Sequence, residues 1–428
     1  MPLEYLIWLA LAIFLLLGTP IFVALGLSTI VVLLLSNVPL SIIPLDLFKI
    51  AEMFPLLAVP AFVLAGSFMD KGGMAAQIVE VASIFVGRMR GGLGVVTIVG
   101  CMFFAAMIGS GPGTVAAMGS LMIPSMIRKG YTPEYAAGVS ATGGTLGILI
   151  PPSNPMIVYG VIGNLSIATL FMAGFLPGFI VGGTLMVTAY LLARRAGFKE
   201  TSEGYTTKEK IACIRRSFWS LMAPVIILGV IYLGICTPVE ASTVAVFYAL
   251  FVGAFITKKL KWKEIWDSIK ITNETIATLT IVVGVSILFG RFLTLYQVPQ
   301  RLTDVMLSIS SDPYMIMLMI VLLLFFLGMF METLATIVIL APILLPVILK
   351  VGIDPYFFGI IWVMTNEVAM LSPPLGVNLF IAMSMANLSL EKTAKGALPF
   401  MAVLILVILI LMKFPEIVLF VPKLFNAL

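Results

Sequence analysis

Hydroxyl and amide side chains collect at two interruptions of an otherwise apolar helical sequence. The first interruption reads Gly109-Ser110-Gly111-Pro112-Gly113-Thr114, and the second reads Pro151-Pro152-Ser153-Asn154-Pro155. Such side-chain oxygens, together with the carbonyls that a broken helix leaves without partners, are suited to hold Na⁺. Interrupted backbone is tolerated at membrane depth only where protein or a water-filled cavity satisfies the freed N–H and C=O groups. The two interruptions therefore predict a binding site.

A related stretch lies 222 residues further along the chain. Thr114 matches Thr336, Gly130 matches Gly352, and Pro151-Pro152 matches Pro373-Pro374, with no gap between the pairs. An internal repeat with interrupted helices in both halves is the sequence pattern of a secondary transporter. Its substrate and coupling-ion sites are expected where the interruptions meet.

The predicted sodium ligands are the small, polar and proline residues at these interruptions. In the first half they are Ser110, Gly111, Gly113, Thr114, Thr145, Pro151, Ser153 and Asn154. In the second half they are Glu332, Thr333, Thr336, Asn366, Ser372, Pro373, Gly376 and Asn378. Any single serine or threonine could instead serve helix packing or bond back to the preceding turn. Their concentration at both interruptions favours a binding role.

Two carboxylates, Glu332 and Glu367, lie in the interrupted region of the second half. An intramembrane carboxylate is a functional candidate by default, because burying its charge in lipid is costly unless it is paired or hydrated. A structural pair or a helix cap is the alternative. At the 222-residue spacing their counterparts are Ser110 and Thr145, so the two half-sites are chemically unequal.

Composition places these residues in a polytopic membrane protein. Of the 428 residues, 61% are hydrophobic and 11% are charged, which is far from the composition of a soluble domain. The apolar runs are continuous and lack the alternation of a membrane barrel, so we expect an all-α fold. The net charge of +5 comes from cations in loops, which are topology signals and not a nucleic-acid site.

Several other functions are excluded by missing residues. The chain has no histidine, which removes a histidine-bound zinc and a Ser-His-Asp triad. Cys101, Cys213 and Cys236 lie in apolar surroundings and are expected to pack as small hydrophobic side chains. Because no phosphate-binding Gly-x4-Gly-Lys-Ser/Thr loop occurs, coupling must come from an ion gradient. Sodium is favoured over protons, since the interruptions are rich in neutral oxygens, and no further cofactor is expected.

Two re-entrant helical hairpins are predicted, each with one of the interruptions at its tip. Residues 93–108 with 115–127, and residues 315–329 with 336–349, form the two pairs. The helices of the first pair are short for a bilayer crossing. By the positive-inside rule its base is cytoplasmic, because cations flank it at Arg88, Arg90, Arg128 and Lys129. The second hairpin is expected to enter from the opposite face, so that the repeats are inverted.

The remaining segments complete the predicted domain organisation. The first repeat, residues 1–200, comprises scaffold helices at 1–70, an interfacial arm at 75–90 and transport elements at 92–193. A basic cytoplasmic linker at 201–216 leads to the second repeat at 217–428, with scaffold helices at 217–257, an arm at 261–273 and transport elements at 276–413. Residues 6–35 are interpreted as two short helices, with one long tilted helix as the alternative. An odd number of crossings would place both termini in the periplasm.

The interrupted segments resemble a known family. Residues 109–117 (GSGPGTVAA), Ile150-Pro151-Pro152-Ser153 and Gly328-Met329-Phe330-Met331-Glu332 are similar to the large membrane subunit of tripartite ATP-independent periplasmic (TRAP) transporters. The resemblance implies a sodium-driven elevator, in which a transport domain carrying both hairpins slides against a scaffold. It also implies two partners, a small four-helix membrane subunit and a periplasmic binding protein that delivers an organic acid.

The resemblance also assigns roles by position. The first sodium site would lie between the Ser110 tip and the break at Pro151, and the second between residues 332–336 and the break at Pro373. Ser110, Ser153 and Glu332 would face the substrate, and we expect Asn154 and Glu367 to join them. The chain departs from the commoner family pattern at Gly111-Pro112-Gly113, where a second small hydroxyl residue is often found. Backbone carbonyls are therefore the expected ligands at that tip.

The function expected from these patterns is the large subunit of a sodium-coupled importer in the inner membrane of a bacterium. Its substrate would be a carboxylate such as sialic acid or a C4-dicarboxylate. A stand-alone anion transporter or channel without a binding protein is the alternative, although channels usually repeat a short pore motif around an oligomeric axis. An intramembrane enzyme is disfavoured, because no paired aspartates and no serine with a plausible base stand out.

Overall fold

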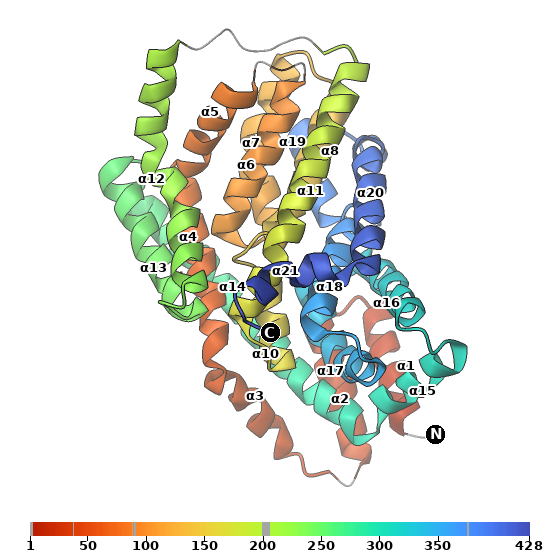
Figure 1. The fold of residues 1–428 in the computed structure, drawn as a ribbon. Coiled ribbons are helices and arrows are strands. Elements are labelled where there is room, and N and C mark those ends of the chain that lie inside the picture. Colours follow the sequence, from red (N-terminus) through yellow and green to blue (C-terminus); the bar gives the residue numbers. More distant parts are fainter. Residues whose placement is uncertain (1–2, 37, 88, 90, 199–205, 375) are drawn as a thin grey trace.

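The computed structural model describes residues 3–36, 38–87, 89, 91–198, 206–374 and 376–428, and these residues are organised as helices and short connections (Figure 1). Within them, eight helices are long and apolar enough to cross a membrane. The predicted all-α fold is thereby confirmed. Arg88, Arg90 and residues 199–205, which entered the topology prediction, lie outside the described residues.

The chain starts with two packed helices, which confirms the two-helix interpretation of residues 6–35. Gly18 has a left-handed φ of 76°, and the Thr19 hydroxyl donates to the Phe14 carbonyl over 2.8 Å, so the chain reverses between them. The helices up to the first hairpin are α1 (Leu3–Leu16), α2 (Ile21–Leu35), α3 (Ile42–Glu52), the 3₁₀ turn η1 (Phe54–Leu57), α4 (Ala58–Lys71) and α5 (Met74–Val86).

The rest of the first half contains a hairpin and a broken helix. The hairpin is α6 (Gly92–Ile108) and α7 (Gly111–Arg128). The broken helix consists of α8 (Pro133–Gly143), the short α9 (Leu146–Leu149) and, after Pro151-Pro152, α10 (Asn154–Gly163). The long α11 (Ile167–Arg195) ends this half.

The second half repeats the order of hairpin, broken helix and long helix after four α-helices and one π-helical turn. It comprises α12 (Thr207–Tyr232), α13 (Pro238–Phe251), the π-helical turn η2 (Val252–Ile256), α14 (Trp262–Leu295), α15 (Val298–Ile309), the hairpin α16 (Pro313–Gly328) and α17 (Thr333–Val351), the broken helix α18 (Pro355–Ala369) and α19 (Val377–Ala386), then α20 (Leu390–Lys413) and α21 (Pro415–Leu424). In both halves a hairpin is thus followed by a helix broken at a Pro-Pro pair, and both Pro-Pro peptide bonds are cis.

Two predicted boundaries do not coincide with the ends of helices. Helix α12 begins at Thr207, inside the predicted linker 201–216, because Thr206 and Glu209 form a capping box in which Glu209 accepts from the Thr206 N–H over 2.7 Å. Helix α14 runs unbroken from Trp262 to Leu295, whereas an arm at 261–273 and a separate crossing helix from 276 were expected. The polar residues between them do not end the helix, since the Thr275 and Thr278 hydroxyls bond back to carbonyls four residues earlier.

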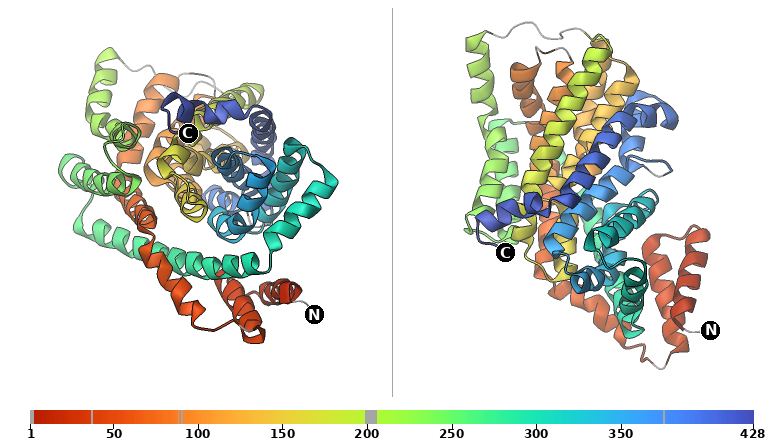
Figure 2. Two further views of the ribbon diagram at one scale, coloured as in Figure 1. Left: turned by 60° about the horizontal axis from the view of Figure 1, so that its bottom comes forward. Right: turned by 45° about the vertical axis from the view of Figure 1, so that its right-hand side comes forward.

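Packing arranges these elements around the hairpins. Helix α4 packs along α13, and α14 passes α2, α3, α4 and α17. Figure 2 shows α14 running along one side of the molecule, between α1–α3 and the hairpin helices. An ion pair of 3.2 Å between Arg291 and the buried Asp46 ties α14 to α3. One hydrophobic cluster extends from α4 to α21, so the hairpins and broken helices share a single core.

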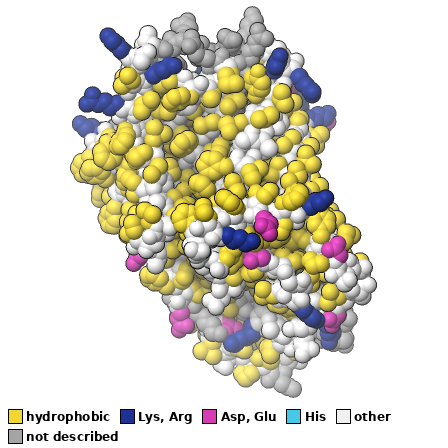
Figure 3. All heavy atoms as spheres, in the orientation of Figure 1, with side chains coloured by type: hydrophobic (Ala, Val, Ile, Leu, Met, Phe, Trp, Pro, Cys, Tyr) yellow, Lys and Arg dark blue, Asp and Glu magenta, His cyan; other side chains and the backbone are white. Residues whose placement is uncertain are grey.

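Charged side chains are distributed unevenly over the surface. Figure 3 shows Lys and Arg gathered toward the end of the molecule that holds the last turn of α11 and the first turns of α12, above a broad hydrophobic belt. The side chains in these turns include Arg194, Arg195, Lys208 and Lys210. The belt fits a membrane-embedded surface. The cytoplasmic orientation of the basic end stays a prediction.

Candidate functional site

The tip of the first hairpin is a tight turn that rests on the first break. Gly109 ends α6 with a left-handed φ of 67°, and a Cβ at this position would lie 2.7 Å from the Pro152 carbonyl oxygen. Ser110 caps α7, because its hydroxyl accepts from the Gly113 N–H over 3.3 Å. The Asn154 N–H donates to the Gly109 carbonyl over 3.2 Å. Glycine at 109 therefore allows the tip and the break to approach closely.

The first break is buried inside the protein. Pro151, Pro152, Ser153 and Asn154 are all buried between the end of α9 and the start of α10. Ser153 caps α10 by accepting from the Met156 N–H over 3.4 Å. The break thus leaves one helix C-terminus and one helix N-terminus within the fold, as an ion site in an interrupted helix requires.

The tip of the second hairpin packs against α18. A Cβ on Gly328 would lie 2.8 Å from the Ala369 side chain, so α16 ends directly against α18. The Asn366 amide donates to the Thr336 hydroxyl, and this hydroxyl donates to the Thr333 carbonyl over 2.8 Å. Asn366 therefore fixes the first turn of α17.

Both tips and both broken helices border one small cavity of about 30 Å³. The predicted site residues that line it are Ser110, Gly111, Asn154, Glu332, Thr333 and Glu367. Its other lining residues are Gly109, Pro112, Ile148, Pro155, Leu334 and Met370. The structure therefore brings together residues that are more than two hundred positions apart in the chain.

Glu367 lies at the centre of this arrangement. Its side chain is buried, with 2% exposure. One carboxylate oxygen accepts from the Asn378 amide over 3.1 Å and the other from the Thr333 hydroxyl over 3.4 Å. A Cβ on Gly111 would lie 2.8 Å from the carboxylate, so the first turn of α7 touches it directly. Glu367 thus joins α7, α17, α18 and α19, and among the described residues no lysine or arginine pairs with it.

Three amide oxygens around the site have no hydrogen-bond partner among the described residues. They are the Oδ1 atoms of Asn154, Asn366 and Asn378, all of which are buried. A buried acceptor without a partner costs about 1–3 kcal/mol. Neutral oxygens of this kind, beside a buried carboxylate, form a donor set that fits a hard cation such as Na⁺.

The other predicted residues do not line this cavity. They are Gly113, Thr114, Thr145, Pro151, Ser153, Thr336, Asn366, Ser372, Pro373, Gly376 and Asn378. The Thr114 hydroxyl donates to the Ser110 carbonyl, and the Thr145 hydroxyl donates to the Thr142 carbonyl at the end of α8. Pro373 is exposed, whereas its counterpart Pro151 is buried, so the two breaks are in different environments.

Sequence reasoning missed the apolar part of the cavity. Ile148, Leu334 and Met370 line it, and the Met370 sulfur lies 3.4 Å from the Thr333 hydroxyl oxygen. The predicted ligands were small, polar and proline residues, and these three residues belong to none of those classes. Their positions beside the tips and breaks were the signal that could have identified them.

The size of the cavity limits what it can hold in this conformation. About 30 Å³ is the space of a water molecule or a bare ion. Pockets that enclose organic ligands usually measure about 300–1,000 Å³. In this conformation the cavity is therefore smaller than a pocket that encloses an organic ligand.

Comparisons with known proteins assign the chain to a family. The model of the DctM component of the tripartite ATP-independent periplasmic transporters matches residues 8–417. The C4-dicarboxylate TRAP transporter large permease protein DctM of Pseudomonas aeruginosa is 38% identical over 379 residues, which are 89% of this chain and 88% of that protein. The sialic acid TRAP transporter large permease protein SiaM of Vibrio cholerae is 35% identical over 374 residues, 87% of each chain.

A longer relative shares nearly the whole chain. The isethionate TRAP transporter permease protein DctMQ of Oleidesulfovibrio alaskensis is 40% identical over 410 residues, or 96% of this chain. The match spans 65% of that relative's own length. The relative is therefore the longer of the two proteins.

Solved structures show the same fold at low sequence identity. The YdaH transporter of Alcanivorax borkumensis superposes with a TM-score of 0.65 over 85% of both chains at 14% identity. MtrF of Neisseria gonorrhoeae gives a TM-score of 0.60 at 13% identity, over 85% of this chain and 82% of that one. With the family match over residues 8–417, these findings identify a multi-pass membrane permease, and the chain belongs to the DctM component family of the tripartite ATP-independent periplasmic transporters.

Proposed function

We propose that this chain is the large membrane subunit of a sodium-coupled importer of an organic acid. The observation that carries the proposal is the cavity between the two hairpin tips, with Glu367 and unpartnered amide oxygens around it. The relatives are named for C4-dicarboxylate, sialic acid and isethionate transport, and all three substrates are organic anions. A carboxylate or sulfonate substrate is therefore the class we expect here.

Sodium is proposed to bind at both half-sites. The first site would use the Ser110 tip, the break at Pro151 and the free Oδ1 of Asn154. The second would use residues 332–336 and the break at Pro373, with the free amide oxygens of Asn366 and Asn378. Bound Na⁺ would coordinate these buried oxygens, which lack hydrogen-bond partners among the described residues, and would balance the buried carboxylate charge.

Three helix N-termini at the cavity support an anionic substrate. Helix α7 starts at Gly111, α10 at Asn154 and α17 at Thr333, and all three residues line the cavity. Helix N-termini carry partial positive charge and free N–H groups, which favour anions. Ser110, Asn154, Glu332 and Glu367 border the same space and are proposed to contact the substrate. Ser153, which caps α10 and does not line the cavity, would contact it only after the tips have opened.

Glu367 gives this scheme a physical basis for coupling. A negative carboxylate beside the cavity repels an anionic substrate, whereas a bound Na⁺ neutralises that repulsion. The ion and the substrate therefore favour each other's binding, and this reciprocity is what a symporter needs.

Alternating access is proposed to occur by an elevator motion of inverted repeats. The helix that follows each break packs on the hairpin of the other half. Helix α10 packs on α17, and helix α19 packs on α7. Exchanged contacts of this kind are expected for two related halves that move as one transport domain. A small four-helix membrane subunit and a periplasmic binding protein are the proposed partners, in the bacterial inner membrane with both termini periplasmic.

Uptake by reconstituted vesicles tests the proposal. The full chain, its membrane partner and the cognate binding protein would be supplied with a panel of labelled organic acids. We expect saturable uptake that stops when external Na⁺ is replaced by K⁺ and when the binding protein is omitted. Uptake that is unchanged by the replacement would contradict sodium coupling, and uptake without a binding protein would support the stand-alone alternative.

A further inference from the structure

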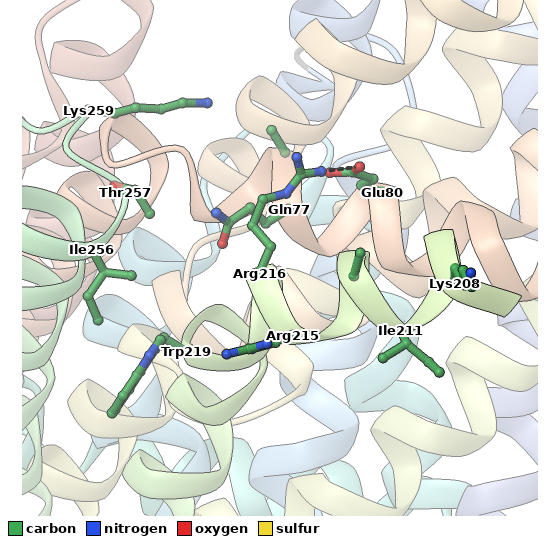
Figure 4. A pocket seen from close by; sticks show the side chains of 12 residues that line it. Gln77, Glu80, Lys208, Ile211, Arg215, Arg216, Trp219, Ile256, Thr257 and Lys259 are labelled. Atoms are coloured by element: carbon green, nitrogen blue, oxygen red, sulfur yellow. Dashed lines mark hydrogen bonds and ion pairs between the residues drawn. The ribbon is translucent and has the colours of Figure 1, made fainter. Parts of the chain in front are cut away.

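A second, larger cavity lies away from the hairpin tips. It measures about 960 Å³ and is bordered by α5, the first turns of α12 and the end of η2 (Figure 4). Helix α5 connects the scaffold helix α4 to the first hairpin, so this cavity lies where the proposed arm meets the scaffold. Nothing in the transport scheme above uses it.

The walls of this cavity are strongly basic. Four cations line it, Lys208, Arg215, Arg216 and Lys259, against one carboxylate, Glu80. Arg216 pairs with Glu80, as Figure 4 shows. Within the described residues the other three cations have no ion pair. An anion that enters the cavity therefore meets uncompensated positive charge.

The cavity is held in shape by contacts between α5 and α12. The Ser220 hydroxyl donates to the Gln77 side-chain oxygen over 2.6 Å, next to the Arg216–Glu80 pair. At the end of α4, a Cβ on Gly73 would lie 2.5 Å from Cδ of Lys259, so glycine at this left-handed turn leaves room for the lysine stem. Helices α5 and α12 are thus in direct contact beside the cations.

Apolar side chains adjoin the basic walls and favour a lipid over a soluble anion. Ile211 and Trp219 line the cavity and are 62% and 41% exposed. Helices α12 and α13 present further exposed apolar side chains, among them Phe218, Val225 and Phe251. Tryptophan beside lysine and arginine is typical of the interface between the headgroups and the hydrocarbon of a bilayer. A phosphate in the cavity could therefore stay attached to acyl chains along these helices.

We propose that this cavity binds the phosphate group of an anionic phospholipid, with the acyl chains lying on the exposed faces of α12 and α13. Basic pockets between membrane helices on the cytoplasmic side are physically suited to such headgroups. The lipid would bridge Arg215 on α12 and Lys259 beyond η2 across the arm α5. It would therefore brace the arm against the scaffold; this consequence rests on the proposed elevator, whereas the binding itself does not.

Lipid titration of the purified full chain, followed by native mass spectrometry in neutral detergent, tests the binding. The probes are phosphatidylglycerol, phosphatidylcholine with the same acyl chains, and glycerol 3-phosphate. We expect phosphatidylglycerol to bind preferentially. Arg215→Gln combined with Lys259→Gln should weaken this binding about tenfold or more, because each cation near an anionic headgroup contributes to its affinity.

The matched control is Lys210→Gln combined with Lys263→Gln. It removes the same charge from α12 and from the first turn of α14, at positions that do not line the cavity. Its phosphatidylglycerol affinity should stay within about twofold of the unmodified chain. Equal weakening in both double variants, or no preference over phosphatidylcholine, would overturn the proposal. If glycerol 3-phosphate bound as tightly as phosphatidylglycerol, the proposal that the bound phosphate belongs to a lipid would be overturned. None of these readouts depends on transport.

Discussion

At the residue scale, Glu367 connects the chemistry of the two halves. Its carboxylate is buried and, within the part of the chain that the structure describes, accepts hydrogen bonds from the neutral groups of Asn378 and Thr333. Neutral donors compensate a buried charge less well than a cation does. The Gly111 backbone lies close to the carboxylate, so the charge of Glu367 acts on the first turn of α7. A cation beside Glu367 would therefore stabilise contacts made by both hairpins.

Replacement of Glu367 by glutamine separates its charge from its shape. Two unit charges about 4 Å apart interact with about 4 kcal/mol at an effective dielectric constant near 20. We expect Glu367→Gln to raise the Na⁺ concentration for half-maximal uptake by about tenfold or more, which corresponds to a loss of at least about 1.4 kcal/mol. Without Na⁺ the variant should unfold at a temperature no lower than that of the unmodified chain. Glu416→Gln, at an exposed position, is the control; the same Na⁺ titration curve for both variants would refute the role of Glu367.

At the element scale, sequence reasoning was strongest where glycine, proline and capping residues interrupt apolar runs. The prediction of helices on either side of Ser110 agrees with α6 and α7, although α7 starts at Gly111, four residues earlier than expected, because Ser110 caps it. The short helices α3, α15 and α21 were not predicted. Each is a short surface helix beside longer apolar runs, and its place is set by tertiary contacts that the sequence pattern does not contain.

The environments of the two breaks could not be predicted from the repeat. Helix α11 covers the first break, where a Cβ on Gly174 would lie 2.8 Å from the Leu149 carbonyl oxygen. In the second half Pro373 remains exposed. Matching Pro-Pro pairs reveal the repeat, but burial depends on how neighbouring helices approach.

Close backbone approach also gives a test at this scale. Gly396 on α20 faces α8, and a Cβ there would lie 2.1 Å from the Glu134 carbonyl oxygen. Gly396→Ala should therefore destabilise the protein by about 1–3 kcal/mol through overpacking and lower its melting temperature in detergent. In Gly229→Ala the new Cβ has nothing within 4 Å, so this control should melt at the same temperature or slightly higher. Equal melting temperatures for both variants would contradict the helix contact.

At the scale of the whole molecule, the proposed inverted repeats require the two hairpins to enter the membrane from opposite faces. Lys129 follows α7, and Lys350 lies in the last turn of α17. The basic end of the molecule would be cytoplasmic by the positive-inside rule. The chain order and the tip cavity agree with this arrangement, since both tips reach one place from separate halves.

Cysteine labelling tests the orientation of the hairpins. In a chain without its three native cysteines, Lys129→Cys and Lys350→Cys would be treated with a membrane-impermeant maleimide. We expect labelling of position 350 in intact cells and of position 129 only in inverted vesicles. Labelling of both positions from the same side would refute the inverted repeat.

Sodium binding to the purified full chain tests the central claim most directly, because it requires neither the substrate nor a partner. Calorimetric titration should show saturable heat with NaCl and none with KCl. Asn378→Ala should weaken the Na⁺ binding, since it removes a free amide oxygen and a donor to Glu367. Ser384→Ala, at an exposed position on the same helix, should leave it unchanged. Identical heats for NaCl and KCl, or unchanged Na⁺ affinity in Asn378→Ala, would contradict a sodium site between the hairpin tips.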